Sequence, residues 1–183
     1  MALSDPVSPN LARLSRIMSI LATLGMIAVP AIVAAIFLYP GASQFLMLNM
    51  SHVGGKLTAA VPILYRIDAL LCETLPLGLS VWALWSLRQL FSNYANGRVF
   101  SAEPLRHLNN VATALFLGVL ADIVMEVPIT FLLTLHNPPG HREITLSFGS
   151  TDVVWLFIAG TVLVIARVMG EARRVADENA AFV

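Results

Sequence analysis

Three acidic residues stand inside apolar stretches of the sequence, and their type and spacing make them candidates for chemistry. Glu73 lies in one stretch, whereas Asp122 and Glu126 lie together in another. Residues four apart share one face of a helix, so we expect Asp122 and Glu126 to point to the same side. A charged side chain at the centre of a bilayer costs at least about 2.5–3.5 kcal/mol, which makes such residues functional candidates. Carboxylates at one depth on neighbouring helices could share a proton or bind a cation.

The same carboxylates could instead have a structural role. Hydrogen bonds to Thr74, Thr130 and backbone carbonyls would let them hold neighbouring helices together. Two cationic or titratable side chains at the predicted outer boundary, Arg66 and His136, could reach inward toward them. The sequence leaves the functional and the structural interpretation open.

A second candidate site consists of arginines in polar segments of the chain. Arg98 and Arg106 lie in a connector over residues 88–107. Arg173 and Arg174 lie in a tail over residues 166–183, which is predicted to continue the helix of the last span. These residues could form a surface that docks a cytosolic partner, or they could contact anionic lipid headgroups. The formal net charge of the chain is zero, so we expect no direct binding of nucleic acid.

The motifs of the common enzyme classes are absent from the sequence. No GxSxG, HExxH, GxxxxGK[ST] or GxGxxG pattern occurs, so we predict that the protein is not an enzyme. The four histidines are dispersed and there is one cysteine, Cys72. We therefore expect no metal site, no cofactor and no internal disulfide.

The composition indicates that these residues are carried by membrane-spanning helices. Hydrophobic residues make up 57% of the chain and charged residues 12%, against roughly 45–50% and 25% in an ordinary soluble protein. A helix needs about 20 apolar residues to cross a bilayer. The first apolar run is longer than the apolar core of a secretory signal peptide, so we expect it to be retained. Four spans are predicted, at about residues 17–39, 69–87, 111–133 and 153–165.

The distribution of Lys and Arg predicts the orientation of these spans. Cytoplasmic segments of membrane proteins carry an excess of basic residues. With both termini in the cytoplasm, eight basic residues lie inside and three, Lys56, Arg66 and Arg142, lie outside. The eight are Arg13, Arg16, Arg88, Arg98, Arg106, Arg167, Arg173 and Arg174.

The segments outside the spans have their own patterns. Residues 1–12 read as a mobile tail, and residues 41–61 as a segment at the outer interface. Apolar and polar residues alternate over residues 144–148, which predicts a short strand in a small extracytoplasmic cap. Asn96-Gly97 predicts a turn, and Ser101 is a candidate N-cap for the helix that follows, with Glu103 in its first turn.

Two segments carry a resemblance to a known family. They are LRQLFSNYANGRVFSAEPLRHLNNVATAL (residues 87–115) and ARVMGEARRVADENAAFV (residues 166–183). Both resemble the bacterial four-span membrane proteins catalogued as domain of unknown function 2975, although Pro104 stands where a polar residue is expected. The resemblance implies an inner-membrane protein without established catalysis, often encoded beside a small helix-turn-helix regulator of the Cro/CI type.

We therefore predict an all-α integral membrane protein of the bacterial inner membrane. Its fold is a single domain over residues 1–183, a four-transmembrane-helix bundle with both termini cytoplasmic and a small extracytoplasmic cap. The predicted function is non-enzymatic and regulatory, with the bilayer and a cytosolic helix-turn-helix transcription regulator as partners. The alternative is a small transporter or a proton- or cation-conducting unit, formed by a homo-oligomer, that uses Glu73, Asp122 and Glu126.

Overall fold

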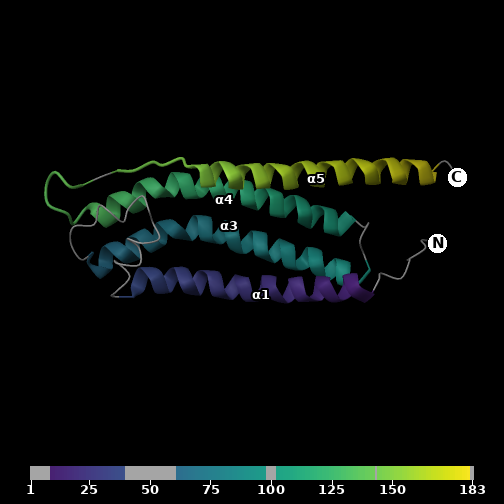
Figure 1. The fold of residues 1–183 in the computed structure, drawn as a ribbon, viewed down its shortest axis with the longest axis horizontal. Coiled ribbons are helices and arrows are strands. Elements are labelled where there is room, and N and C mark those ends of the chain that lie inside the picture. Colours follow the sequence, from purple (N-terminus) through teal and green to yellow (C-terminus); the bar gives the residue numbers. More distant parts are fainter. Residues whose placement is uncertain (1–8, 40–60, 98–101, 143, 182–183) are drawn as a thin grey trace. The chain divides into compact units, whose positions relative to one another are not determined.

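The structure, a computed structural model, describes residues 9–39, 61–97, 102–142 and 144–181. Four α-helices make up most of these residues, and the described part of the chain contains no strand (Figure 1). Each helix is long and apolar enough to cross a membrane, which confirms the all-α class and indicates a multi-pass membrane protein. The helices are α1 (Pro9–Leu38), α3 (Ile63–Ala95), α4 (Ala102–Thr134) and α5 (Ser150–Ala181).

The helices extend beyond the predicted spans. α1 begins at Pro9, because the fixed φ of proline suits the first helical position. The prediction of a mobile tail over residues 1–12 is therefore wrong from residue 9 onward, and residues 1–8 lie outside the described part. α5 continues as one helix to Ala181, which confirms the predicted helical extension of the last span.

A tight turn follows α3, as the Asn96-Gly97 pair predicts. The amide of Gly97 donates to the carbonyl of Tyr94 at 3.1 Å, and the φ of Gly97 is 81°. That left-handed conformation favours glycine. Ser101 lies outside the described residues, but Glu103 is in the first turn of α4 as predicted.

The strand predicted over residues 144–148 is wrong. These residues are exposed and half-buried in alternation, but they form no strand ladder. Their neighbour is α4, a helix, and two of their backbone amides donate to side chains of that helix. An alternating sequence predicts an extended conformation without specifying what it pairs with. Residues 41–60 of the predicted interface segment lie outside the described part.

Contacts divide the chain into two compact units, and all four helices contribute to each. Unit 1 consists of Met1–Ile27, Ser80–Phe116 and Val154–Val183. Unit 2 consists of Ala28–Leu79 and Leu117–Val153.

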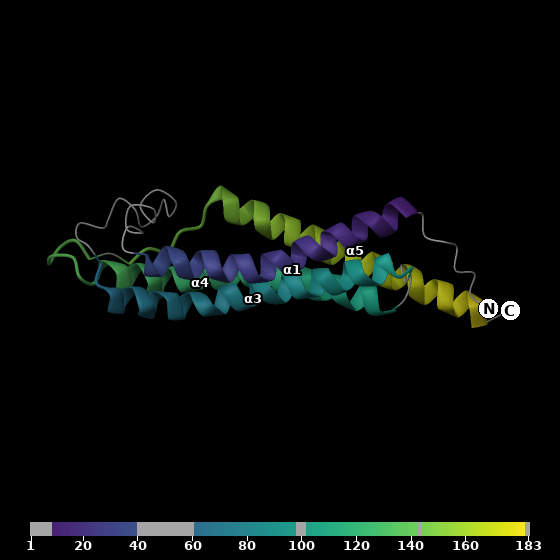
Figure 2. The same cartoon turned by 90° about the horizontal axis from the view of Figure 1, so that it is seen from below.

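Small side chains dominate the core of unit 1. A Cβ atom placed on Gly25 would lie 3.4 Å from Leu84, and one placed on Gly170 would lie 3.5 Å from Leu105. Helix backbones can approach closely where side chains are small. In this unit α1 and α4 begin, and α3 and α5 end, toward the same side (Figures 1 and 2). The buried small residues are Ser15, Ala22, Ala83, Ser86, Ala112, Ala114, Ala159 and Ala166.

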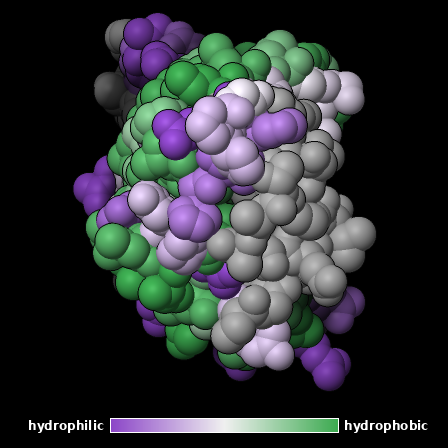
Figure 3. Space-filling view, turned by 90° about the vertical axis from the view of Figure 1, so that its left-hand side faces the viewer, coloured by the Kyte–Doolittle hydropathy of each residue, from purple (hydrophilic) through white to green (hydrophobic). Residues whose placement is uncertain are grey.

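Larger side chains fill the core of unit 2. The buried cluster joins α1, α3 and α4, and half-buried Met125 and Leu132 pack against it. At the end of this unit that carries the connection between α4 and α5, hydrophilic residues gather beside hydrophobic ones (Figure 3). The buried members of the cluster are Phe37, Val61, Ala69, Ile129 and Leu133.

Candidate functional site

Glu126 holds the extended segment that precedes α5. Its Oε2 accepts a hydrogen bond from the backbone amide of Ser147 at 2.7 Å. Its Oε1 accepts a second one from the Ser147 hydroxyl, also at 2.7 Å. Both carboxylate oxygens of a half-buried residue are thus engaged by one serine, and hydrogen bonds to carboxylates are stronger than those between neutral groups.

A second contact repeats the pattern one helical turn further along α4. The amide of Thr145 donates to Oγ1 of Thr130 at 3.2 Å, and this hydroxyl donates to the carbonyl of Glu126 at 2.8 Å. Four residues of helix rise about 6 Å, and two residues of extended chain advance about 6.6 Å. The alternate residues Thr145 and Ser147 therefore match the helix positions Thr130 and Glu126. The extended segment runs antiparallel to α4.

The structural interpretation of the carboxylates thus gains a specific partner for Glu126. The expected partners are engaged elsewhere, since Thr74 donates to the carbonyl of Leu71 at 2.6 Å. Thr130 bonds the backbone carbonyl of Glu126 and not its carboxylate. Ser147, from a different part of the chain, takes the role that the sequence predicts for Thr74 and Thr130.

Asp122 and Glu73 have a different environment. Asp122 is exposed on the surface of unit 2, and Glu73 is half-buried. Asp122 lies near enough to repel the carboxylate of Glu73, and Asp152 near enough to repel Asp122. Asp152 itself accepts a hydrogen bond from the amide of Gly149 at 2.8 Å and lies in the first turn of α5. Unit 2 therefore brings three carboxylates, those of Glu73, Asp122 and Asp152, into one neighbourhood.

Arg66 and His136 are occupied by other contacts in unit 2. Arg66 is buried, and its Nη1 donates to the carbonyl of Tyr39 at 2.9 Å, just beyond the end of α1. A cation is favourable there because the carbonyl end of a helix is partly negative. The ring of His136 lies 6.2 Å from that of Tyr65, measured between centroids. The Arg66 guanidinium thus caps the C-terminal end of α1.

In unit 1, Arg106 and Arg173 line a common groove of about 560 Å³. The groove lies between the start of α4 and the second half of α5, and Arg167 and Glu171 also line it. Arg106 and Arg167 are exposed, whereas Arg173 is half-buried. Two of the four arginines that the sequence singles out for docking are therefore brought together.

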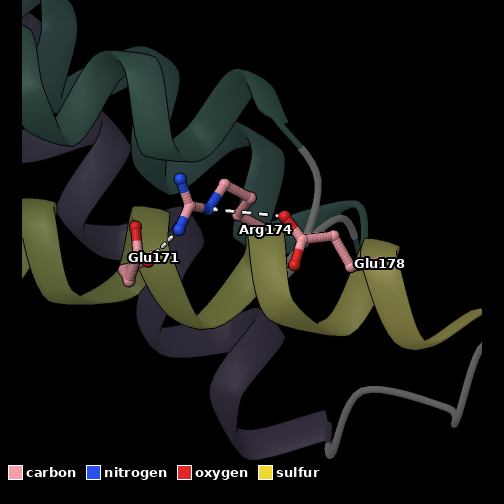
Figure 4. A network of polar contacts seen from close by, with 3 residues as sticks. All are labelled: Glu171, Arg174 and Glu178. Carbon is pink, nitrogen blue, oxygen red and sulfur yellow. Dashed lines mark hydrogen bonds and ion pairs between the residues drawn. The ribbon is translucent and has the colours of Figure 1, made fainter.

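Arg174 lies in a separate set of contacts on α5. Its Nη2 donates to Oε1 of Glu171 at 2.5 Å, and its Nε lies 3.6 Å from Oε1 of Glu178 (Figure 4). All three side chains are mostly exposed, so the pairs contribute little to stability. Arg98, the fourth arginine, lies outside the described residues.

Sequence reasoning missed Ser147, Asp152 and Arg167 as site residues. The polar positions of the alternating segment point to Ser147, but no sequence signal connects it to Glu126. Asp152 has the acid-in-first-turn signature of a helix start. Arg167 follows the last predicted span directly, and it is recognisable as a groove residue once α4 is placed beside it.

Among the residues that the structure describes, no three His, Cys, Asp or Glu side chains are grouped so that they could hold a metal ion. His107 is buried, and its ring lies 5.7 Å from that of Trp85 in an edge-to-face arrangement. Such pairs are ordinary packing contacts. The candidate functional groups are therefore the carboxylates of unit 2 and the arginines of unit 1.

Comparison with known proteins identifies the family of this chain. No curated protein and no solved structure is significantly similar to this chain. A family described as a protein of unknown function, DUF2975, matches residues 56–183, which include α3, α4 and α5. The matched part covers most of the chain and contains both segments on which the resemblance rests. The chain therefore belongs to the DUF2975 family of proteins of unknown function.

Proposed function

We propose that this chain is a non-enzymatic regulatory protein of the bacterial inner membrane that binds a cytosolic partner. The observation that carries the proposal is the length of α5, which runs without a break for 32 residues to Ala181. The predicted span ends at residue 165, so the second half of the helix projects from the membrane. An exposed charged face, formed by Glu171, Arg174 and Glu178, is presented there (Figure 4).

The excess of Lys and Arg supports a cytoplasmic position for this face and for both termini. Residues 135–149, which connect α4 to α5, would then form the small extracytoplasmic cap. A reporter that is active only outside the inner membrane, fused after Val183, should be silent. An active reporter at that position would reverse the orientation and remove the docking face from the cytoplasm.

The partner that we propose is a small helix-turn-helix transcription regulator, which the family resemblance favours. The mixed charges of the α5 face suit a partner with its own mixed charges, since complementary charges fix the orientation of a complex. Binding at the membrane would keep such a regulator from its DNA.

Crosslinking in native membranes, capture through an N-terminal tag and mass spectrometry test this proposal. The full chain should recover a helix-turn-helix protein, and the Arg174→Ala variant should recover much less of it. Arg88→Ala is the matched control, because it removes one exposed arginine elsewhere in unit 1. Equal recovery by the full chain and by Arg174→Ala, or recovery of the tagged chain alone, would contradict the proposal.

A second candidate function is favoured by the position of Asp122. This side chain is exposed on the surface of a helix that is apolar enough to span the membrane. A second copy of the chain could cover it and so complete a path for a proton or cation past Asp122 and Glu73. Proton or cation flux into proteoliposomes should then fall strongly in Asp122→Asn. It should fall little in Glu126→Gln, because both carboxylate oxygens of Glu126 already accept hydrogen bonds from Ser147. Absence of flux in the unmodified protein would exclude this function.

A further inference from the structure

We propose that the groove in unit 1 binds the headgroup phosphate of an anionic phospholipid. Three arginines line the groove, Arg106 from α4 and Arg167 and Arg173 from α5. A guanidinium presents several N–H donors in a planar fork that matches the oxygens of a phosphate. The volume of about 560 Å³ is in the range of small-molecule sites, which are roughly 300–1,000 Å³.

Among the described residues that line the groove, basic side chains outnumber acidic ones. Glu171 is the one carboxylate in its lining, and it already accepts a hydrogen bond from Arg174, which lies outside the groove. Within the described residues, no ion pair joins Arg106 or Arg167 to a carboxylate. Arg106 and Arg167 therefore carry positive charge that an anion can neutralise.

The position of the groove selects a lipid among phosphate-containing ligands. On α5 the lining begins at Ala166, directly after the predicted end of the span at residue 165. On α4 it ends at Asn109, two residues before the predicted start of the span at residue 111. These positions are at headgroup depth, where basic pockets between helices bind anionic lipids.

The surface beside the groove suits the acyl chains of such a lipid. The preceding turn of α5 exposes Val164 and Ile165, at 61% and 49% of their full accessible surface. A phosphodiester held by Arg106 and Arg167 would leave its acyl chains against these side chains. A free phosphate would gain the arginine contacts but not the apolar ones.

The groove shares Glu171 with the docking face assigned above, but Glu178 of that face does not line it. Removing Glu178 should affect partner capture without affecting the lipid, whereas removing Arg106 should do the reverse. A result that contradicts the regulatory proposal would therefore not contradict the lipid site.

Native mass spectrometry of the full chain, released from phosphatidylcholine nanodiscs with added phosphatidylglycerol, measures the preference for anionic lipid. The unmodified protein should retain phosphatidylglycerol over phosphatidylcholine. Arg106→Ala and Arg167→Ala should each weaken this retention about tenfold, as expected for the loss of one charge-assisted hydrogen bond. Arg88→Ala, which removes the same charge from an exposed position on α3 outside the groove, should retain the lipid as the unmodified protein does.

A variant that keeps every arginine provides an independent test. Ala102 is exposed and lines the groove, so Ala102→Glu places a carboxylate beside the arginines and should expel the lipid. Three outcomes would overturn the proposal. The first is an equal loss in Arg88→Ala and Arg106→Ala, which would indicate diffuse electrostatic attraction. The second is unchanged retention in Ala102→Glu. The third is displacement of the lipid by inorganic phosphate at equal concentration, which would indicate a site for free phosphate.

Discussion

Unit 1 and unit 2 are built from parts of the same helices, but different side chains hold each of them together. Alanines and serines make up most of the core of unit 1, together with Leu90 and Val111, and glycines lie where α1 meets α3 and where α4 meets α5. The core of unit 2 contains Phe37, Ile129 and Leu133, and a carboxylate anchors a non-helical segment there. Small residues permit close approach of backbones and thereby favour one packing geometry. In unit 2, larger side chains and side-chain hydrogen bonds hold together helices, an extended segment and charged groups.

The largest expected effect comes from removing a large side chain of unit 2. Leu133 is completely buried in the core cluster, so Leu133→Ala should lower the free energy of unfolding by about 2–5 kcal/mol. Unfolding in mixed micelles, followed by circular dichroism, measures this change. Leu117→Ala is the control, because Leu117 belongs to the same helix and unit but is exposed. Equal losses in both variants would mean that unit 2 is not held by this cluster.

The reverse substitution tests unit 1. Ala112 is fully buried, and a larger side chain there would separate helices that approach closely. Ala112→Leu should lower the free energy of unfolding by about 1–3 kcal/mol. The same change at Ala172, which is exposed on α5 in the same unit, should have little effect. A stabilised Ala112→Leu protein would show that the core of unit 1 has unfilled space and that the two units pack alike.

The third effect, similar in size to that of Ala112→Leu, concerns the hydrogen bonds of Glu126. Glu126→Ala removes the acceptor of both Ser147 bonds and should cost about 1–3 kcal/mol. Its clearest signature is faster hydrogen exchange at the Ser147 amide. Glu126→Gln should cost less, since its amide can still accept from the Ser147 backbone and donate to the hydroxyl. In a double-mutant cycle the stability losses of Glu126→Ala and Ser147→Ala should be non-additive. Additive losses would show that the two side chains do not stabilise each other.

Composition and hydropathy predict the helical architecture, because membrane-length apolar runs specify helices directly. The Asn96-Gly97 turn and the helical tail follow from local signals in the same way. Two features differ from the prediction, the start of α1 at Pro9 within the tail predicted over residues 1–12 and the absence of a strand at residues 144–148. Pro9 favours a helix start, and the helix continues into the apolar run that follows. Residues 144–148 pack against α4, whereas a strand would need another strand as its hydrogen-bonding partner.

In the candidate sites too, the sequence predicts some features from local signals and leaves others unpredicted. Intramembrane position identifies Glu73, Asp122 and Glu126 from the sequence alone. The contact of Glu126 with Ser147 joins residues 21 apart in the chain, and the groove joins Arg106 to residues beyond 165. Such pairings depend on how helices pack, and a single sequence carries no signal for them.

The match between α4 and the extended segment also restricts how the connection between α4 and α5 can change in length. Thr145 and Ser147 face Thr130 and Glu126, whereas Ile144, Leu146 and Phe148 are exposed. Adding one residue after Thr145 would exchange the two sets, as a register slip does in a β-sheet. Adding two residues would restore the alternation but would move Ser147 about 6.6 Å along α4, away from Glu126. The two contacts with α4 therefore fix the number of residues between Thr145 and Ser147, in addition to which side chains of the segment face the helix.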